Sequence, residues 1–250
     1  LSAKTCGQIN PSTYTGAILI ELLHTGTLIH DDIIDDSDTR RGFFSIKAMW
    51  KNKVAVLMGD YFLSKSFLYS LENNEFNFLK IISNSVKEMV EGELLQMEGA
   101  NKLDITEDMY IDIIKRKTAS LMASCCEIGS VSVAPENGLS ETMALFGENI
   151  GISFQIKNDL LDLKENSRSG RPPGNDIREK NLTLPLIFAL KKSGFSDRKR
   201  ILNVIRQSRQ DSDGINEVIN FVHSRGGIEY ATSQMNSFKE KGLTILRELP

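Results

Sequence analysis

The stretch YTGAILIELLHTGTLIHDDIIDD, residues 14–36, decides the fold. Its apolar residues recur at the three- and four-residue spacing of a helix, and the segment then ends in acidic residues. Further segments with this spacing occupy residues 52–71, 75–97, 106–133, 140–163 and 183–191, whereas alternating runs typical of strands are scarce. We therefore predict an all-α fold, with helix starts at Ser12 or Thr13, at Thr106 and at Ser140.

The composition is that of an ordinary globular protein and excludes several functional classes. The chain has 250 residues, of which 40% are hydrophobic, and a net charge of -3, which argues against a nucleic-acid partner. Cys6, Cys125 and Cys126 lack the spacing of a disulfide framework or a zinc site, which indicates a reducing, cytoplasmic setting. The most apolar run, residues 17–23, is too short to span a bilayer, so we expect no transmembrane segment.

Acidic residues gather at the end of the first long segment. Asp31 and Asp35 are four residues apart and therefore share a helix face, about 6 Å apart along the axis, with Asp32 between them. Mg²⁺ prefers oxygen ligands and is commonly held by one or two carboxylates together with substrate phosphates. The motif thus indicates a magnesium–diphosphate site. The alternative is a solvated acidic helix end, partly neutralised by Arg40 and Arg41.

A second apolar segment ends in the same way, in FQIKNDLLD at residues 154–162, which contains Asn158, Asp159 and Asp162. Two such ends that face each other across a helical bundle would form a metal-lined pocket. The segment that follows, residues 164–181, is rich in arginine and lysine and includes Lys180. This composition suits a lid over phosphate, and a solvated connection is the alternative.

Several motifs in register over nearly the whole chain resemble those of the all-trans polyprenyl diphosphate synthases. They are LIHDDIID at residues 28–35 with Arg40-Arg41-Gly42, then Gly59-Asp60, Gly92-Glu93 with Gln96, Lys117-Thr118-Ala119, Phe154-Gln155, and TLPL at residues 183–186. The resemblance implies an isoprenoid-synthase-type helical bundle around a central active-site cavity. It further implies a single polyprenyl synthetase domain over residues 1–250 that lacks N- and C-terminal family segments, and a homodimer.

The resemblance also implies the reaction: condensation of an allylic diphosphate with isopentenyl diphosphate, with three Mg²⁺ ions. Asp31 and Asp35 match direct metal ligands and Asp32 a residue that orients water, and the second metal motif comprises Asn158, Asp159 and Asp162. Arg40 matches a contact to the allylic diphosphate, whereas Arg41 and His24 match contacts to isopentenyl diphosphate. Residues that hold the allylic diphosphate and face the carbocation are matched by Lys117, Thr118 and Gln155. The released diphosphate is the implied proton acceptor.

The chain departs from the family pattern at two functional positions. Asn158 stands where the second acidic motif normally begins with Asp; its amide oxygen can still bind Mg²⁺, but it carries no charge. The lysine normally two residues before the Thr-Leu-Pro segment is Asn181, and the adjacent Lys180 is a candidate to replace it for phosphate binding. The resemblance also places Gly26 and Thr27, one turn before Asp31, at the positions that face the product tunnel in the family, and their small size there implies an open tunnel and a product longer than farnesyl.

Two other functions stay open on the sequence alone. A class I terpene cyclase uses similar acidic sites, although Asp162 and Asn166 stand where its second metal motif needs other residues. A non-catalytic regulatory subunit of a heteromeric synthase would keep the bundle while it loses metal affinity through Asn158 and Asn181. A synthase makes product from farnesyl and isopentenyl diphosphates, a cyclase makes a hydrocarbon, and a regulatory subunit turns over neither.

Overall fold

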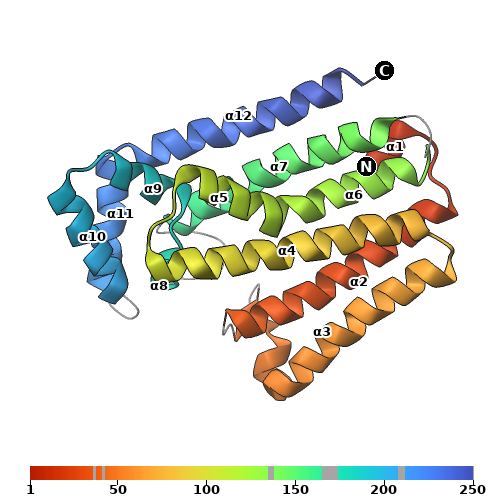
Figure 1. Ribbon diagram of the computed structural model, residues 1–250, viewed down its shortest axis with the longest axis horizontal. Helices are drawn as coiled ribbons and strands as arrows, with labels where there is room; N and C mark the ends of the chain where they lie inside the picture. The colour runs from red at the N-terminus through yellow and green to blue at the C-terminus, as the bar shows by residue number, and fades with distance from the viewer. Residues whose placement is uncertain (36–37, 41–42, 135–137, 165–173, 208–211, 250) are drawn as a thin grey trace. The chain divides into compact units, whose positions relative to one another are not determined.

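The computed structural model is all-α apart from one small hairpin, which confirms the predicted fold class (Figure 1). The structure describes residues 1–35, 38–40, 43–134, 138–164, 174–207 and 212–249, with the backbone alone at 39 and 40. Its elements, in order, are α1 Ser2–Cys6, α2 Pro11–Ile34, β1 Thr39–Arg40, β2 Phe43–Phe44, α3 Ile46–Glu72, α4 Phe76–Lys102, α5 Glu107–Ile114, the π-helix η1 Lys115–Ala119, α6 Ser120–Val131, α7 Leu139–Asp162, α8 Asn175–Arg178, α9 Leu184–Lys191, α10 Phe195–Gln207, α11 Ser212–Ser224 and α12 Gly227–Arg247.

The helix ends follow from local capping. Helix α2 starts earlier than predicted, because Asn10 rather than Ser12 or Thr13 is its N-cap: the Asn10 side chain accepts from the Thr13 amide at 3.1 Å. Pro11 occupies the first helical turn, where its missing N–H costs nothing. The predicted start at Thr106 is confirmed, since its side chain accepts from the amide of Met109. Capping thus sets where the long apolar segments begin.

The chain divides into two compact units. Unit 1 comprises Leu1–Asn84 and Ser124–Ala144, and unit 2 comprises Ser85–Ala123 and Leu145–Pro250. In unit 1, α2 and α3 lie side by side (Figure 1). Gly26 of α2 sits at this contact, where an added Cβ would lie 3.1 Å from the carbonyl oxygen of Gly59 and 3.2 Å from the Leu63 side chain. Unit 1 is therefore built on a close approach of two helices.

This position corrects the expectation that Gly26 opens a product tunnel. A larger side chain there would crowd α3, because the nearest atoms belong to the α3 backbone and to Leu63. Leu23 and Leu19, which lie one and two turns before Gly26 on α2, are fully buried. Their burial is that of ordinary core residues in unit 1.

Unit 2 holds a continuous apolar core contributed by α5, η1, α7 and α9–α12. Ile156, Leu184, Val218 and Ala231 are fully buried within it. No helix among the described residues is long and apolar enough to cross a bilayer. Ile152, Ile156 and Leu160 of α7 belong to this core, and the same helix carries the predicted site residues Gln155, Asn158, Asp159 and Asp162.

Candidate active site

The first predicted metal motif lies at the end of α2, in unit 1. The amide of Asp35 donates to the carbonyl oxygen of Asp31 at 2.8 Å, and Asp35 keeps helical dihedral angles, φ -76° and ψ -1°. The helical geometry thus places Asp31 and Asp35 on one face, as predicted. Asp32 is buried, with 6% of its surface exposed. Arg40 contributes its backbone to β1, and Arg41 lies outside the described residues.

Two histidines of α2 occupy different surroundings. His24, the predicted contact to isopentenyl diphosphate, is half-buried, and its carbonyl oxygen accepts from the Thr27 hydroxyl at 2.9 Å. The Nε2 atom of His30 lies 3.4 Å from an Asp60 carboxylate oxygen. A Cβ added at Gly59 would collide with the His30 ring, at 2.2 Å from Nε2. Glycine at position 59 therefore leaves room for the His30 ring, whose Nε2 also lies 3.2 Å from the carbonyl oxygen of Val56.

The predicted Lys117-Thr118 pair lies in the π-helical turn η1, in unit 2. Such turns insert one extra residue into a helix and are frequent at functional sites. Glycines let neighbouring helices approach this turn closely. A Cβ added at Gly92 of α4 would lie 2.8 Å from the backbone nitrogen of Lys117, and one added at Gly151 of α7 would lie 2.6 Å from Ala119 Cα. Lys117 Nζ lies 2.5 Å from a carboxylate oxygen of Glu93, which is only 16% exposed. Lys117 is thus oriented by α4 rather than left as one member of a solvated basic run.

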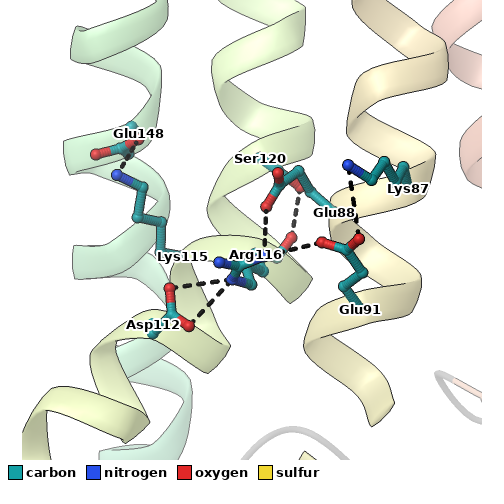
Figure 2. A network of polar contacts seen from close by, with 8 residues as sticks. All are labelled: Lys87, Glu88, Glu91, Asp112, Lys115, Arg116, Ser120 and Glu148. Carbon is teal, nitrogen blue, oxygen red and sulfur yellow. Dashed lines mark hydrogen bonds and ion pairs between the residues drawn. The ribbon is translucent and has the colours of Figure 1, made fainter. Parts of the chain in front are cut away.

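A separate ion-pair network holds the start of the same turn (Figure 2). Lys115 pairs with Glu148 of α7 at 3.1 Å. Arg116 contacts three carboxylates at 2.9–3.3 Å, those of Asp112, Glu88 and Glu91. Each pair is partly exposed and contributes modestly alone, but a network that converges on one guanidinium restricts its geometry. Three consecutive basic residues are thereby drawn to different acidic partners.

A continuous hydrogen-bond chain joins three of the predicted site residues to a fourth residue. The Thr118 hydroxyl donates to Gln155 Oε1 at 2.9 Å, and Gln155 Nε2 donates to Asp159 Oδ1 at 2.7 Å. The hydroxyl of Tyr110 donates to the other oxygen, Asp159 Oδ2, at 2.6 Å. The chain crosses from η1 to α7 and back to α5. The structure thus brings Thr118, Gln155 and Asp159 together, as the resemblance implies.

Three carboxylates, those of Asp159, Asp162 and Asp176, lie near enough to influence one another where α7 ends and α8 begins. The two oxygens of Asp162 accept from the backbone amides of Asn175 and Asp176, both at 3.1 Å, so Asp162 caps α8. Burial raises the pKa of Asp159 from 3.8 to about 6, an effect opposed by its bonds from Tyr110 and Gln155. Burial and the nearby charges of Asp159 and Asp162 raise the pKa of Asp176 well above its ordinary value. The folded protein therefore disfavours the ionised forms of Asp159 and Asp176.

The donor set at this cluster fits magnesium. Within the ranges that the structure describes, no three His, Cys, Asp or Glu side chains converge closely enough to hold a metal ion by themselves. A site that shares Mg²⁺ with substrate phosphate needs only one or two protein carboxylates and keeps several waters. A divalent cation would lower the raised pKa values of Asp159 and Asp176 by offsetting the charge repulsion between the carboxylates. Asn158, at the departure from the family motif, is half-buried one helical turn from Asp162.

Asn181, which stands where the family has a lysine, and Lys180, the candidate to replace that lysine, differ in position. Asn181 lines a small cavity of about 60 Å³ together with Asp159 and Asp176. Lys180, the preceding residue, has a left-handed φ of 62°. Its backbone amide donates to the carbonyl oxygen of Ile177, and this hydrogen bond closes the C-terminal end of α8. The residue that lines the acidic cavity is therefore Asn181, with its side-chain amide. Whether Lys180 binds phosphate stays a prediction.

Sequence reasoning missed two residues of this region. Tyr110 lies in an apolar helical stretch, where a tyrosine is most simply explained as a core residue. Asp176 lies in the segment 164–181, whose arginine and lysine residues predict a phosphate lid; residues 165–173 of that segment lie outside the described residues. The one available signal was indirect: a buried tyrosine hydroxyl needs a partner, and the acidic motif offers acceptors.

Comparisons with known proteins find similar sequences and similar structures. Residues 1–222 match the family model described as polyprenyl synthetase. The solanesyl-diphosphate synthase 2 of Oryza sativa subsp. japonica is 38% identical over 93% of this chain and 56% of its own length. The heptaprenyl diphosphate synthase component 2 of Bacillus subtilis is 31% identical over 97% of this chain and 69% of its own length. The chain thus spans a little over half of the rice relative.

Among solved structures, a polyprenyl synthase of Caulobacter crescentus complexed with calcium and isoprenyl diphosphate is similar over the whole described chain. The TM-score is 0.92, the sequence identity is 29%, and the match covers 100% of this chain and 76% of the other. That protein was captured with a divalent cation and a prenyl diphosphate, the ligand types indicated here by the acidic motifs.

Proposed function

Because the chain belongs to the polyprenyl synthetase family, we propose that it is a magnesium-dependent trans-prenyl diphosphate synthase. It condenses an allylic diphosphate with isopentenyl diphosphate. The observation that carries this proposal is the hydrogen-bond chain from Thr118 through Gln155 to Asp159, because it links the predicted carbocation-facing residues to the second metal motif. Burial of a carboxylate is costly, and titratable groups perturbed in this way cluster at functional sites.

In this proposal Mg²⁺ is held by two residue sets, Asp31, Asp32 and Asp35 in unit 1 and Asn158, Asp159 and Asp162 in unit 2. When bound, the ions neutralise charge on the departing diphosphate. The structure supports different tasks within each set. Asp159 and Asp32 are buried, at 5% and 6% exposed, which favours roles in orienting water or neighbouring side chains. The more accessible Asp31, Asp35 and Asn158 are better placed to bind a cation directly.

The remaining residues bind and orient the two substrates. Lys117, held by Glu93, supplies a positive charge to the allylic diphosphate, and Arg40 supplies a second. Arg41 and His24 bind isopentenyl diphosphate. Lys180 is proposed as an additional phosphate contact.

The reaction then needs no protein base. The allylic C–O bond breaks and its electron pair stays on the diphosphate. The double bond of isopentenyl diphosphate attacks the allylic carbon, and the released diphosphate removes a proton from the new cation. The oxygen atoms of Thr118 and Gln155 present lone pairs to the positive charge while it exists.

We propose that the product is longer than farnesyl. The support is the similarity to relatives named for solanesyl and heptaprenyl products. Plant relatives are named as chloroplastic, so the cytoplasmic setting stays a prediction for this chain.

We propose further that the protein forms a homodimer through α3. Large apolar side chains of α3 recur at heptad spacing and are 39–67% exposed: Val54, Leu57, Tyr61, Leu68 and Leu71. A stripe of this kind on one helix is typical of a surface that a second helix covers. Light scattering after size exclusion should give twice the chain mass for the wild type and the monomer mass for Leu57→Glu. A monomeric wild type would contradict the dimer.

The activity itself is tested by incubating the protein with farnesyl diphosphate, isopentenyl diphosphate and Mg²⁺, followed by mass spectrometry of the products. Elongated diphosphates support the synthase. A cyclised hydrocarbon would instead identify a cyclase. No turnover by the protein alone would favour a subunit of a heteromeric synthase, an alternative motivated by Asn158 and by the similarity to a protein named as a component of its synthase.

A further inference from the structure

The hydroxyl of Tyr110 donates to one acceptor in a buried environment. The side chain is 4% exposed and lies beside Ile113 and Ile114 in the wall of the small cavity. Its hydroxyl donates to Asp159 Oδ2 at 2.6 Å, a short bond of the charge-assisted type. A buried tyrosine needs one hydrogen-bond partner. This one is the carboxylate that also fixes Gln155.

Hydrogen-bond chemistry gives the chain a direction. An ionised carboxylate can only accept, so the Gln155 group that faces Asp159 must be its NH₂. The Gln155 oxygen must then face Thr118, whose hydroxyl donates its one proton to that oxygen. With that proton engaged, Thr118 can present only lone pairs to anything else that approaches it. Asp159 thus determines, through Gln155, that the Thr118 hydroxyl donates to Gln155 and leaves its lone pairs available.

We propose that Tyr110 is a positioning residue that fixes the Asp159 carboxylate and, through it, directs the Gln155 and Thr118 oxygen atoms toward the developing allylic cation. This inference rests on the proposed synthase function and deepens it. Dipoles held with their negative ends toward positive charge stabilise a transition state because they need no reorganisation when the charge appears. Without the tyrosine hydroxyl, Asp159 Oδ2 loses its donor and the carboxylate can rotate, so the Gln155 amide loses its fixed orientation.

The chain offers a matched control for the substitution Tyr110→Phe. Tyr230, also in unit 2, donates its hydroxyl to a carboxylate oxygen of Glu107 at 2.5 Å, and its ring stacks on Phe188. Tyr230→Phe therefore removes the same group from the same kind of bond, without touching Asp159. Single-turnover rates are the proper readout because product release can limit steady-state turnover.

We expect Tyr110→Phe to lower the single-turnover rate about tenfold, with KM and the Mg²⁺ concentration for half-maximal rate unchanged. Tyr230→Phe should keep the wild-type rate. A defect that excess Mg²⁺ relieves would show that the hydroxyl acts on metal affinity, and it would overturn the inference. So would an unchanged rate in Tyr110→Phe. An unchanged unfolding midpoint in the variant guards against a trivial loss of structure.

A double-mutant cycle separates positioning from general support of the fold. If Tyr110 acts through Thr118, the rate losses of Tyr110→Phe and Thr118→Val must be non-additive, because the second change removes the group that the first misdirects. Additive losses overturn the inference while the synthase function stands. An inactive wild type overturns both, so the two failures are distinguishable.

Discussion

Replacing Asp159 by asparagine is expected to stabilise the metal-free protein at neutral pH. Asp159 is 5% exposed, and burial raises its pKa from 3.8 to about 6. The folded state therefore favours the protonated carboxyl. The stability that this group contributes is fully present below pH 3.8 and is lost as pH rises through about 6. At pH 8 the folded protein carries the whole penalty of the buried charge.

The size of the effect follows from the pKa. A rise from 3.8 to about 6 corresponds to a penalty on the order of 3 kcal/mol at 1.36 kcal/mol per pKa unit. Asparagine removes the charge and keeps the shape. Its oxygen can accept from Tyr110, and its NH₂ can donate to Gln155 once that amide turns over. Asp159→Asn should thus gain up to about 3 kcal/mol at pH 8 and less at pH 5.

Urea unfolding in EDTA at pH 5 and pH 8 measures this difference. Asp104→Asn is the control. The Asp104 side chain is 78% exposed, and its ion pair with Arg198, at 3.5 Å, lies on the surface, where such pairs contribute little. The free energy of unfolding of this variant should therefore change by less than about 0.5 kcal/mol. Added Mg²⁺ should stabilise the wild type more than Asp159→Asn, since a bound cation compensates the carboxylate. A variant less stable than the wild type at pH 8, or a difference independent of pH, would refute the reasoning.

Three further outcomes are expected. Asp31→Ala should abolish Mg²⁺-dependent turnover without lowering the free energy of unfolding, because it relieves repulsion at a helix C-terminus; wild-type turnover would refute its role as a ligand. Gly151→Ala should cost about 1–3 kcal/mol of stability, since its Cβ would lie 2.6 Å from Ala119 Cα, whereas Gly194→Ala, with open space around it, should change little; equal urea midpoints would contradict this. Cys125, whose pKa burial raises to about 12, should alkylate very slowly at pH 8, when about one thiol in 10⁴ is ionised, and rapid labelling detected by peptide mapping would argue against its burial.

The fold was largely predictable because its signal is local. Helical spacing of apolar residues recurs in every long segment, and the predicted span 140–163 differs by one residue at each end from α7, Leu139–Asp162. Where prediction failed, a tertiary contact or a cap decided the outcome. Gly26 illustrates this: sequence shows a missing side chain, but only the structure shows that the space is filled by α3. Likewise, α3 contains a kink at Lys51, with φ 67°, between two helical segments, and no local sequence pattern predicts it.

The site was predictable only where the motif is contiguous. Spacing within one helix placed Asp31 and Asp35 correctly on one face, since one helical turn fixes their separation. The contact of Tyr110 with Asp159 joins residues 49 positions apart, and no periodicity relates them. Its physical cause is the shortage of hydrogen-bond partners in a dry core, a property of the folded state rather than of any short stretch.

The carboxylate cluster also gives a physical reading of Asn158. Burial raises the pKa values of Asp159 and Asp176 before any cation binds, and nearby carboxylates add to this effect: Asp162 for Asp159, and both Asp159 and Asp162 for Asp176. Asn158 is adjacent to Asp159 and one helical turn from Asp162, so a fourth charge there would add to that repulsion in the metal-free protein. The amide avoids this cost and still offers an oxygen to Mg²⁺. It gives up part of the attraction for the cation in return, so the departure from the family motif trades metal affinity against stability and does not by itself imply a site that has lost its chemistry.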